Sequence, residues 1–186
     1  MSRCVNICPV GFIDERIIKH LGECIASRCG LVYRLSDGME NPEYAYDETR
    51  QQYNSKLILK RLLQYRSHDS VRSIGITHVD LYVPILKYVF GLAEIEGECA
   101  VISTYRLRPQ FYEQPANPYL LLDRVEKTAM HELGHTFGLT HCRDRGCVMY
   151  SSTRIEDTDF KQTDFCPTCS ELFKWKLDKL SPQPNL

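Results

Sequence analysis

The sequence of 186 residues lacks a long apolar run and lacks an apolar segment at its beginning. A helix that crosses a bilayer needs ~20 apolar residues in a row, and no stretch of this chain approaches that length. The opening residues, MSRCVNICPVGFIDERII, contain neither the apolar core nor the small-residue cleavage site of a secretion signal. These absences predict a cytoplasmic protein without a membrane partner.

The chain also lacks an excess of charge of either sign. It has 23 Lys and Arg against 24 Asp and Glu, for a net charge of −1. Proteins that bind nucleic acid usually present a basic surface, so this balance argues against such a partner. Repeats and low-complexity tracts are also missing from the sequence. We therefore expect one domain over residues 1–180, a tail over 181–186, and a monomer.

The spacing of apolar residues predicts a mixture of strands and helices. The predicted strands cover residues 3–9, 31–35, 73–83, 89–95 and 99–105. The predicted helices cover residues 14–28, 47–66, 119–138 and 169–180. Strands and helices alternate in the first half of the chain, and a pair of strands precedes the longest helix. This order favours an α/β fold with a mixed sheet.

One motif carries specific chemistry. Residues 131–141 read HELGHTFGLTH, which fits the pattern H-E-x-x-H-x-x-G-x-x-H. Residues four apart lie one above the other on a helix, so His131 and His135 can aim their imidazoles at one point. Gly138 can adopt a positive φ, which would end the helix and let the chain bring His141 back to that point. The spacing therefore predicts a metal site with three histidine ligands.

Three protein ligands leave one position for water, which is the arrangement of a catalytic zinc site. Zinc lowers the pKa of its bound water from ~16 to about 7. Glu132 projects about 100° around the helix from His131, so it can reach this water without occupying a metal position. We expect Glu132 to act as general base and then as proton donor to the leaving amine. The alternative is a helix with stabilising polar residues and one histidine that faces the core.

Four of the nine cysteines lie close together near the end of the chain. Four residues separate Cys142 from Cys147, and two separate Cys166 from Cys169. In a reducing compartment such pairs are more often metal ligands than disulfides, and four thiolates satisfy a closed structural zinc site. Free cysteines or an iron–sulfur site are the alternatives. The other five cysteines lie among apolar residues and are expected to pack as small hydrophobic side chains.

Met149 follows the last histidine of the motif by eight residues and lies between the two cysteine pairs. The histidine motif, this methionine and the four cysteines together resemble the archaemetzincins, a branch of the metzincin zinc peptidases. The segments DLYVP (80–84), FGLA (90–93) and STYRL (103–107) also resemble that family. The resemblance covers residues 5–180.

The resemblance implies a compact metzincin-like fold, in which a twisted mixed β-sheet with an antiparallel edge strand lies beside an active-site helix. Residues 1–138 would form an N-terminal subdomain, and residues 139–180 a small irregular C-terminal subdomain with the Met-turn and the Cys4 zinc site. Met149 would pack beneath the histidines. Two zinc ions per chain are implied, one catalytic and one structural. A substrate would pair with the edge strand, for which residues 93–95 or 99–102 are the candidates.

These features predict zinc-dependent hydrolysis of peptide bonds in a peptide or protein substrate. A catalytically weak zinc-binding module that recognises peptides is the alternative, although a pure binder has no need of Glu132 beside the metal. A zinc-ribbon-like adaptor is a third reading, and the acidic composition of residues 156–164 argues against it. Tyr150 is expected to pack, with donation to an oxyanion as its alternative role. Arg106 and His78 are weak candidates for substrate contact.

Overall fold

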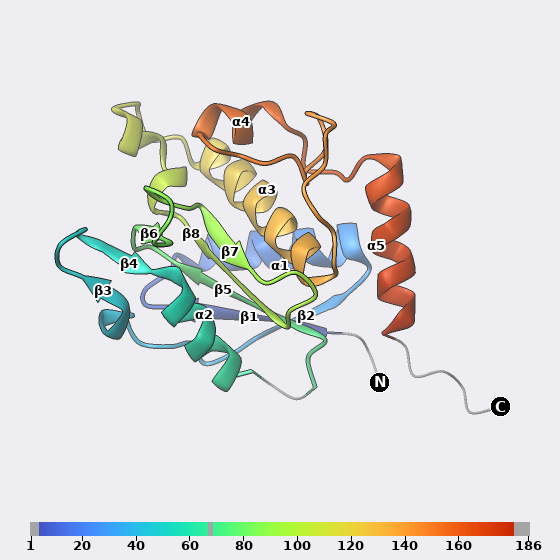
Figure 1. The fold of residues 1–186 in the computed structure, drawn as a ribbon, viewed down its shortest axis with the longest axis horizontal. Coiled ribbons are helices and arrows are strands. Elements are labelled where there is room, and N and C mark those ends of the chain that lie inside the picture. The colour runs from blue at the N-terminus through green and yellow to red at the C-terminus, as the bar shows by residue number, and fades with distance from the viewer. Residues whose placement is uncertain (1–3, 67–68, 181–186) are drawn as a thin grey trace.

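A computed structural model of the protein describes residues 4–66 and 69–180. The strands of the central sheet are Cys4–Val10 (β1), Val32–Leu35 (β2), Arg72–Thr77 (β5), Gly91–Ala93 (β7) and Cys99–Ser103 (β8). They lie in the order β2-β1-β5-β8-β7 and form a twisted mixed sheet (Figure 1). The first four strands in this order run parallel, and β7 runs antiparallel to β8. The predicted α/β fold class is therefore confirmed.

Helices cover both faces of the sheet (Figure 1). Helices α1 (Glu15–Cys29) and α3 (Pro118–Thr136) pack on one face, and α2 (Ser55–Gln64) packs on the other. Successive side chains of a strand point to opposite faces. In β1, Val5 and Ile7 therefore join the core beneath α1 and α3, whereas Cys8 and Val10 join the core beneath α2. Burial on both faces explains why β1 and β8 are nearly continuous apolar runs.

The predicted second helix begins later than expected. The segment around its predicted first turns forms two strands of a small second sheet, Tyr46–Asp47 (β3) and Gln52–Asn54 (β4), which Leu81–Tyr82 (β6) completes. The side chain of Asn54 accepts a hydrogen bond from the N–H of Lys56 and caps α2. The cap residue fixes the start of the helix at Ser55.

The strand predicted over residues 73–83 is divided between the two sheets. β5 ends at Thr77, and β6 pairs with β4 instead of continuing β5. Asp80 explains the break, because its carbonyl accepts the N–H of Tyr53 at 2.8 Å and its carboxylate binds Arg106 at 2.6 and 2.7 Å. An alternating apolar pattern does not reveal such a change of partner.

The antiparallel edge strand is β7. Of the two candidate segments, residues 99–102 are wrong, because they belong to β8 and β8 lies between β5 and β7. Of the other candidate segment, residues 93–95, only Ala93 lies in the edge strand, as the last residue of β7. The hairpin loop begins directly after Ala93, which leaves the following two residues outside the strand.

Two further helices follow α3, namely α4 (Ile155–Phe160) and α5 (Pro167–Lys179). The sequence predicts α5 but not α4, whose six residues are too few to show a helical period. Among the described residues, no helix is both long enough and apolar enough to cross a membrane. The predicted tail, 181–186, lies outside the described residues, and the division into subdomains at residue 138 stays a prediction.

Candidate active site and metal centres

The histidine motif occupies the last turns of α3. Asn117 caps the helix with its side chain, and Pro118 occupies the first position, where a missing N–H costs nothing. Every residue from Arg124 to Thr136 is buried. The motif therefore sits on a rigid element between the sheet and the C-terminal segment.

Gly138 turns the chain at the end of this helix, as predicted. Its φ is 87°, a value that L side chains rarely adopt. The N–H of Gly138 donates to the carbonyl of His135 at 2.9 Å, and the N–H of Leu139 donates to that of Gly134 at 3.0 Å. These bonds close the helix and direct the chain back toward its own last turn, where His141 follows.

The structure brings the three histidines together. The Nε2 atoms of His131 and His135 are 3.1 Å apart. The ring centre of His141 lies 5.2 Å from that of His131 and 4.9 Å from that of His135. One ring nitrogen from each of the three lies within 4.8 Å of the others, so a single ion could contact all three.

Backbone carbonyls fix the protonation of two of these rings. The Nδ1 atom of His131 lies 2.8 Å from the carbonyl oxygen of Val148, and that of His135 lies 2.7 Å from the carbonyl oxygen of Leu139. A carbonyl oxygen only accepts, so each Nδ1 carries the proton and each Nε2 presents a lone pair. Two lone pairs 3.1 Å apart repel each other unless a cation lies between them. The donor set therefore fits zinc.

The surroundings keep these histidines neutral, which is the form that binds a metal. Burial lowers the pKa of His131 well below its usual range, and the nearby charges of Lys161 and His135 lower it further. Burial also lowers the pKa of His135 and of His141. At neutral pH no proton competes strongly for the three ring nitrogens.

Glu132 is buried next to the histidines and borders the same cavity. Burial raises the pKa of its carboxyl to about 8, although the charge of Lys161 opposes this shift. Gly91 of the edge strand lies directly against it, since a Cβ at this glycine would be 2.7 Å from Cγ of Glu132. The edge strand can approach the carboxylate this closely only because residue 91 has no side chain.

A cavity of about 540 Å³ opens over the histidines. One part of its wall is β7, and other parts are the loop that precedes this strand and residues 151–153. Val83, Tyr88, Val89 and Phe90 make the wall beside β7 largely apolar. The cavity therefore joins the three histidines to the unpaired edge of β7.

Met149 is fully buried in the turn that follows the motif. The N–H of Tyr150 donates to the carbonyl of Cys147 at 2.9 Å and closes this turn. A Cβ at Gly134, between the two helical histidines in sequence, would lie 2.4 Å from Sδ of Met149. The methionine thus packs against α3 at the level of the histidines, where the resemblance placed it.

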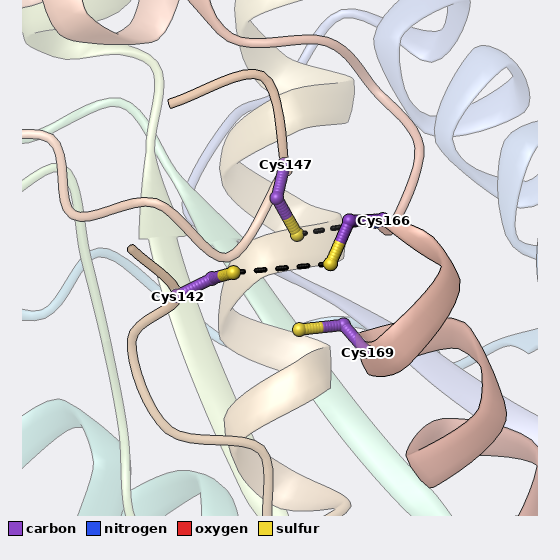
Figure 2. Close-up of side chains that lie close together, drawn as sticks. All are labelled: Cys142, Cys147, Cys166 and Cys169. Atoms are coloured by element: carbon purple, nitrogen blue, oxygen red, sulfur yellow. Dashed lines mark hydrogen bonds between the residues drawn. The ribbon is translucent and has the colours of Figure 1, made fainter. Parts of the chain in front are cut away.

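The four clustered cysteines also converge (Figure 2). Cys142 and Cys147 come from the loop after α3, and Cys166 and Cys169 come from the start of α5, with all four sulfurs within 4.8 Å of one another. The sulfurs of Cys142 and Cys166 are 3.8 Å apart, which is too far for a disulfide. Zinc with four sulfur ligands at ~2.3 Å separates pairs of sulfurs by about 3.8 Å. The cluster therefore fits a closed zinc site.

Backbone N–H groups support thiolates in this cluster. The N–H of Cys166 donates to the sulfur of Cys147 at 3.3 Å, and the N–H of Asp144 donates to that of Cys142 at 3.4 Å. A hydrogen bond from the N–H of Cys169 lowers the pKa of Cys166. The five other cysteines, Cys4, Cys8, Cys24, Cys29 and Cys99, are buried and free, as expected for core residues.

Comparison with known proteins decides the family. The signature described as Peptidase family M54 matches residues 24–175. The chain belongs to this family, the archaemetzincins. Archaemetzincin from Methanocaldococcus jannaschii is 42% identical over 171 residues, which cover 91% of this chain and 93% of that protein.

Two solved archaemetzincin structures share the fold. The crystal structure of the Methanopyrus kandleri protein has a TM-score of 0.79 and 35% identity, and it covers 94% of this chain and 96% of its own. The Archaeoglobus fulgidus structure, a complex with malonate, has a TM-score of 0.79 and 30% identity, and it covers 91% of this chain and 99% of its own. As an archaemetzincin, the chain is a zinc metallopeptidase, a hydrolase of peptide bonds.

Lys161 is the residue of this archaemetzincin site that the sequence did not reveal. Its ammonium lies 3.0 Å from the carbonyl of Tyr150 and 3.4 Å from Nδ1 of His131, and its buried side chain lines the cavity. Burial lowers the pKa of Lys161 to about 8, although the charge of Glu132 opposes this shift. Only the tertiary fold brings this lysine to the histidines. The one sign of this role in the sequence is that Lys161 is the only basic residue in the acidic stretch 156–164.

Three weaker candidates lie elsewhere. Among the described residues, those that line the cavity include Ser151 but not Tyr150, which favours packing for the tyrosine. Arg106 binds the carboxylate of Asp80 and stacks over the ring of Tyr88, so its role is structural. His78 directly follows β5, lies beside Gly11 and does not line the cavity.

Proposed function

We propose that this archaemetzincin hydrolyses peptide bonds at a zinc held by His131, His135 and His141, and that Cys142, Cys147, Cys166 and Cys169 hold a second, structural zinc. The observation that carries the first assignment is the approach of two unprotonated Nε2 atoms to 3.1 Å. When bound there, zinc supplies the polarisation that makes water a nucleophile at neutral pH.

Glu132 acts as general base and then as general acid in this proposal. Its carboxylate borders the cavity beside the histidines and takes a proton from the attacking water. Burial raises the pKa of Glu132 to about 8, which makes the ionised group a strong proton acceptor. The protonated carboxyl then returns the proton to the amine that leaves. Lys161 contributes a fixed positive charge beside this carboxylate and favours its ionised form.

β7 positions the substrate in this proposal. Its outer edge is free of a strand partner among the described residues, and Gly91, Leu92 and Ala93 all line the cavity. An extended peptide can pair with such an edge through main-chain hydrogen bonds. The apolar side chains of the neighbouring wall suit an apolar substrate side chain next to the cleaved bond.

The burial of Glu132 also favours a second candidate, a peptide-binding module with little turnover. A carboxyl group with a pKa of about 8 is largely protonated at neutral pH unless a nearby cation shifts it back. The two candidate functions differ in whether zinc and Lys161 lower the pKa of Glu132 enough for its carboxyl group to be ionised at neutral pH.

A peptide-library cleavage screen with the zinc-loaded protein tests the proposal. We expect cleavage that a hydroxamate chelator blocks and that Glu132→Ala reduces about 10³-fold or more while zinc is retained. Glu94→Gln, a change of an exposed acidic residue outside the cavity, is the control and should cleave normally. Binding of library peptides without cleavage would support the second candidate, and unchanged cleavage by Glu132→Ala would contradict the role of this base.

We expect two zinc ions at the sites named above, a monomer, and no membrane or nucleic-acid partner. A cytoplasmic location stays a prediction.

A further inference from the structure

A third cluster of ligand-type side chains joins the back of α3 to α1. His20 and Cys24 lie one turn apart on α1, and Glu126 lies on α3. Nε2 of His20 is 3.5 Å from Sγ of Cys24 and 3.2 Å from Oε2 of Glu126. All three ligand atoms lie within 4.8 Å of one another.

These distances match the edges of a metal coordination tetrahedron. With zinc–nitrogen and zinc–oxygen distances near 2.1 Å and zinc–sulfur near 2.3 Å, tetrahedral angles place N and S about 3.6 Å apart and N and O about 3.4 Å apart. The i, i+4 spacing of His20 and Cys24 is the same one that lets His131 and His135 converge. Helical geometry thus aims two ligands at one point here as well.

The charges around Glu126 leave room for a divalent cation. Its other oxygen, Oε1, accepts a hydrogen bond from Nε of Arg28, and Nη1 of Arg28 also binds Asp164. Asp164 balances the positive charge of Arg28. The carboxylate of Glu126 and a thiolate at Cys24 would then balance a doubly charged ion. A hydrogen bond to the non-ligating oxygen is also how carboxylate ligands are commonly oriented.

The cluster is separate from the catalytic site. Glu126 precedes His131 by five positions, which places it about 7.5 Å away along the helix axis and about 140° around it. It therefore faces α1, whereas His131 faces the cavity. The side chain of His20 is 30% exposed, so ions and water can enter from solvent, whereas that of Glu126 is only 8% exposed.

We propose that His20, Cys24 and Glu126 form a third metal site that takes zinc or a similar borderline divalent cation. One nitrogen, one thiolate and one carboxylate suit such an ion better than they suit magnesium or calcium. The bound ion would tie α1 to the helix that carries the catalytic histidines. Binding requires the thiol of Cys24 to release its proton to solvent.

Metal stoichiometry tests this site without any substrate. The reduced protein is equilibrated with excess zinc, freed of unbound ion by gel filtration, and analysed for zinc per chain. We expect Cys24→Ala and His20→Gln each to hold one zinc fewer than the wild type. Cys29→Ala removes another buried thiol from α1 and should hold as much zinc as the wild type.

Cobalt gives a second readout. Cobalt(II) binds N, O and S sites more weakly than zinc, so it does not displace zinc from occupied sites. Added to protein in which only the histidine and four-cysteine sites hold zinc, it should produce a thiolate-to-cobalt absorption band in the wild type and in Cys29→Ala. Cys24→Ala should show none. Equal zinc contents for all four proteins, or a cobalt band that survives Cys24→Ala, would overturn the proposal and leave the cluster as an ion pair beside a thiol.

Discussion

His141 of the histidine site and Cys142 of the cysteine cluster are adjacent in the chain, yet the fold builds the two sites in opposite ways. Two of the histidines stand on a buried helix and are oriented by backbone carbonyls, and the site opens into a cavity of about 540 Å³. The cysteines come from a loop and from the start of a helix, and four sulfurs face one another. Three donors beside a cavity leave a position for reacting groups, whereas four donors close the coordination shell. Zinc bound at both places, as proposed, would therefore be suited to chemistry in one and to holding the chain in the other.

Loss of the proposed cysteine-bound zinc should have the largest effect, because it would remove both stability and activity. For Cys166→Ser we expect the free energy of unfolding to fall by about 4 kcal/mol or more, since the binding free energy of a structural zinc is part of the folding free energy. Trp175, the only tryptophan, lies on α5, so its fluorescence reports on this segment. Cys99→Ala, which removes a buried thiol far from the cluster in sequence, should change the fluorescence little. A variant as stable as the wild type would mean that the cluster is not a structural metal site.

Loss of the proposed histidine-bound zinc should remove catalysis without disturbing the C-terminal segment. His135→Ala is expected to lose one zinc and to reduce peptide cleavage about 10³-fold or more, because the metal and its polarising effect are gone. Trp175 fluorescence in the folded protein should stay unchanged, since the cysteine cluster keeps its ion. Metal analysis and fluorescence on the same sample measure both quantities. A fluorescence change as large as that of Cys166→Ser would show that the sites are not separable.

Replacement of Lys161 tests whether catalysis at the histidine site depends on a nearby positive charge as well as on the metal ligands. Lys161→Met keeps most of the side-chain volume and removes the charge that lies near Glu132 and His131. We expect zinc to be retained and kcat/KM to fall about 10²-fold, mainly through kcat, because the charge favours the ionised base. Lys179→Met, at the exposed end of α5, is the matched control. A change in KM alone would assign Lys161 to substrate binding instead.

Gly134 links the two regions sterically and should give the smallest effect. A Cβ at this position would lie 2.4 Å from Sδ of Met149, so Gly134→Ala has to displace the turn between the two metal clusters. We expect a loss of about 1–3 kcal/mol in the free energy of unfolding. At Gly146 a Cβ would meet only the carboxylate of Asp144 at 3.4 Å, so Gly146→Ala should be nearly neutral. Equal denaturation midpoints for the two variants would mean that Met149 moves aside without cost.

The convergence of the histidines and of the cysteines could be predicted because their geometry is local. A helix period brings His131 to His135, a glycine turns the chain, and two short cysteine spacings recur. Lys161 and Gly91 could not be predicted, because each reaches Glu132 through packing between distant segments. The break between β5 and β6 has the same origin, since Asp80 is held by Tyr53 and Arg106 from other parts of the chain. Local patterns determine which atoms can bind a metal, and tertiary contacts determine the charge and space around it.

The tip of the β7–β8 hairpin is attached to the catalytic helix. The N–H of Glu96 donates to the carbonyl of His135 at 2.9 Å, and Lys176 of α5 forms an ion pair with the side chain of Glu96. The strand edge therefore cannot slide relative to the histidines or to Glu132. For a peptide paired with β7, the number of residues between its first paired amide and its cleaved bond is then set by the protein. The substrate residues that pair with β7 would therefore always occupy the same positions relative to the cleaved bond, wherever that bond lies in the peptide.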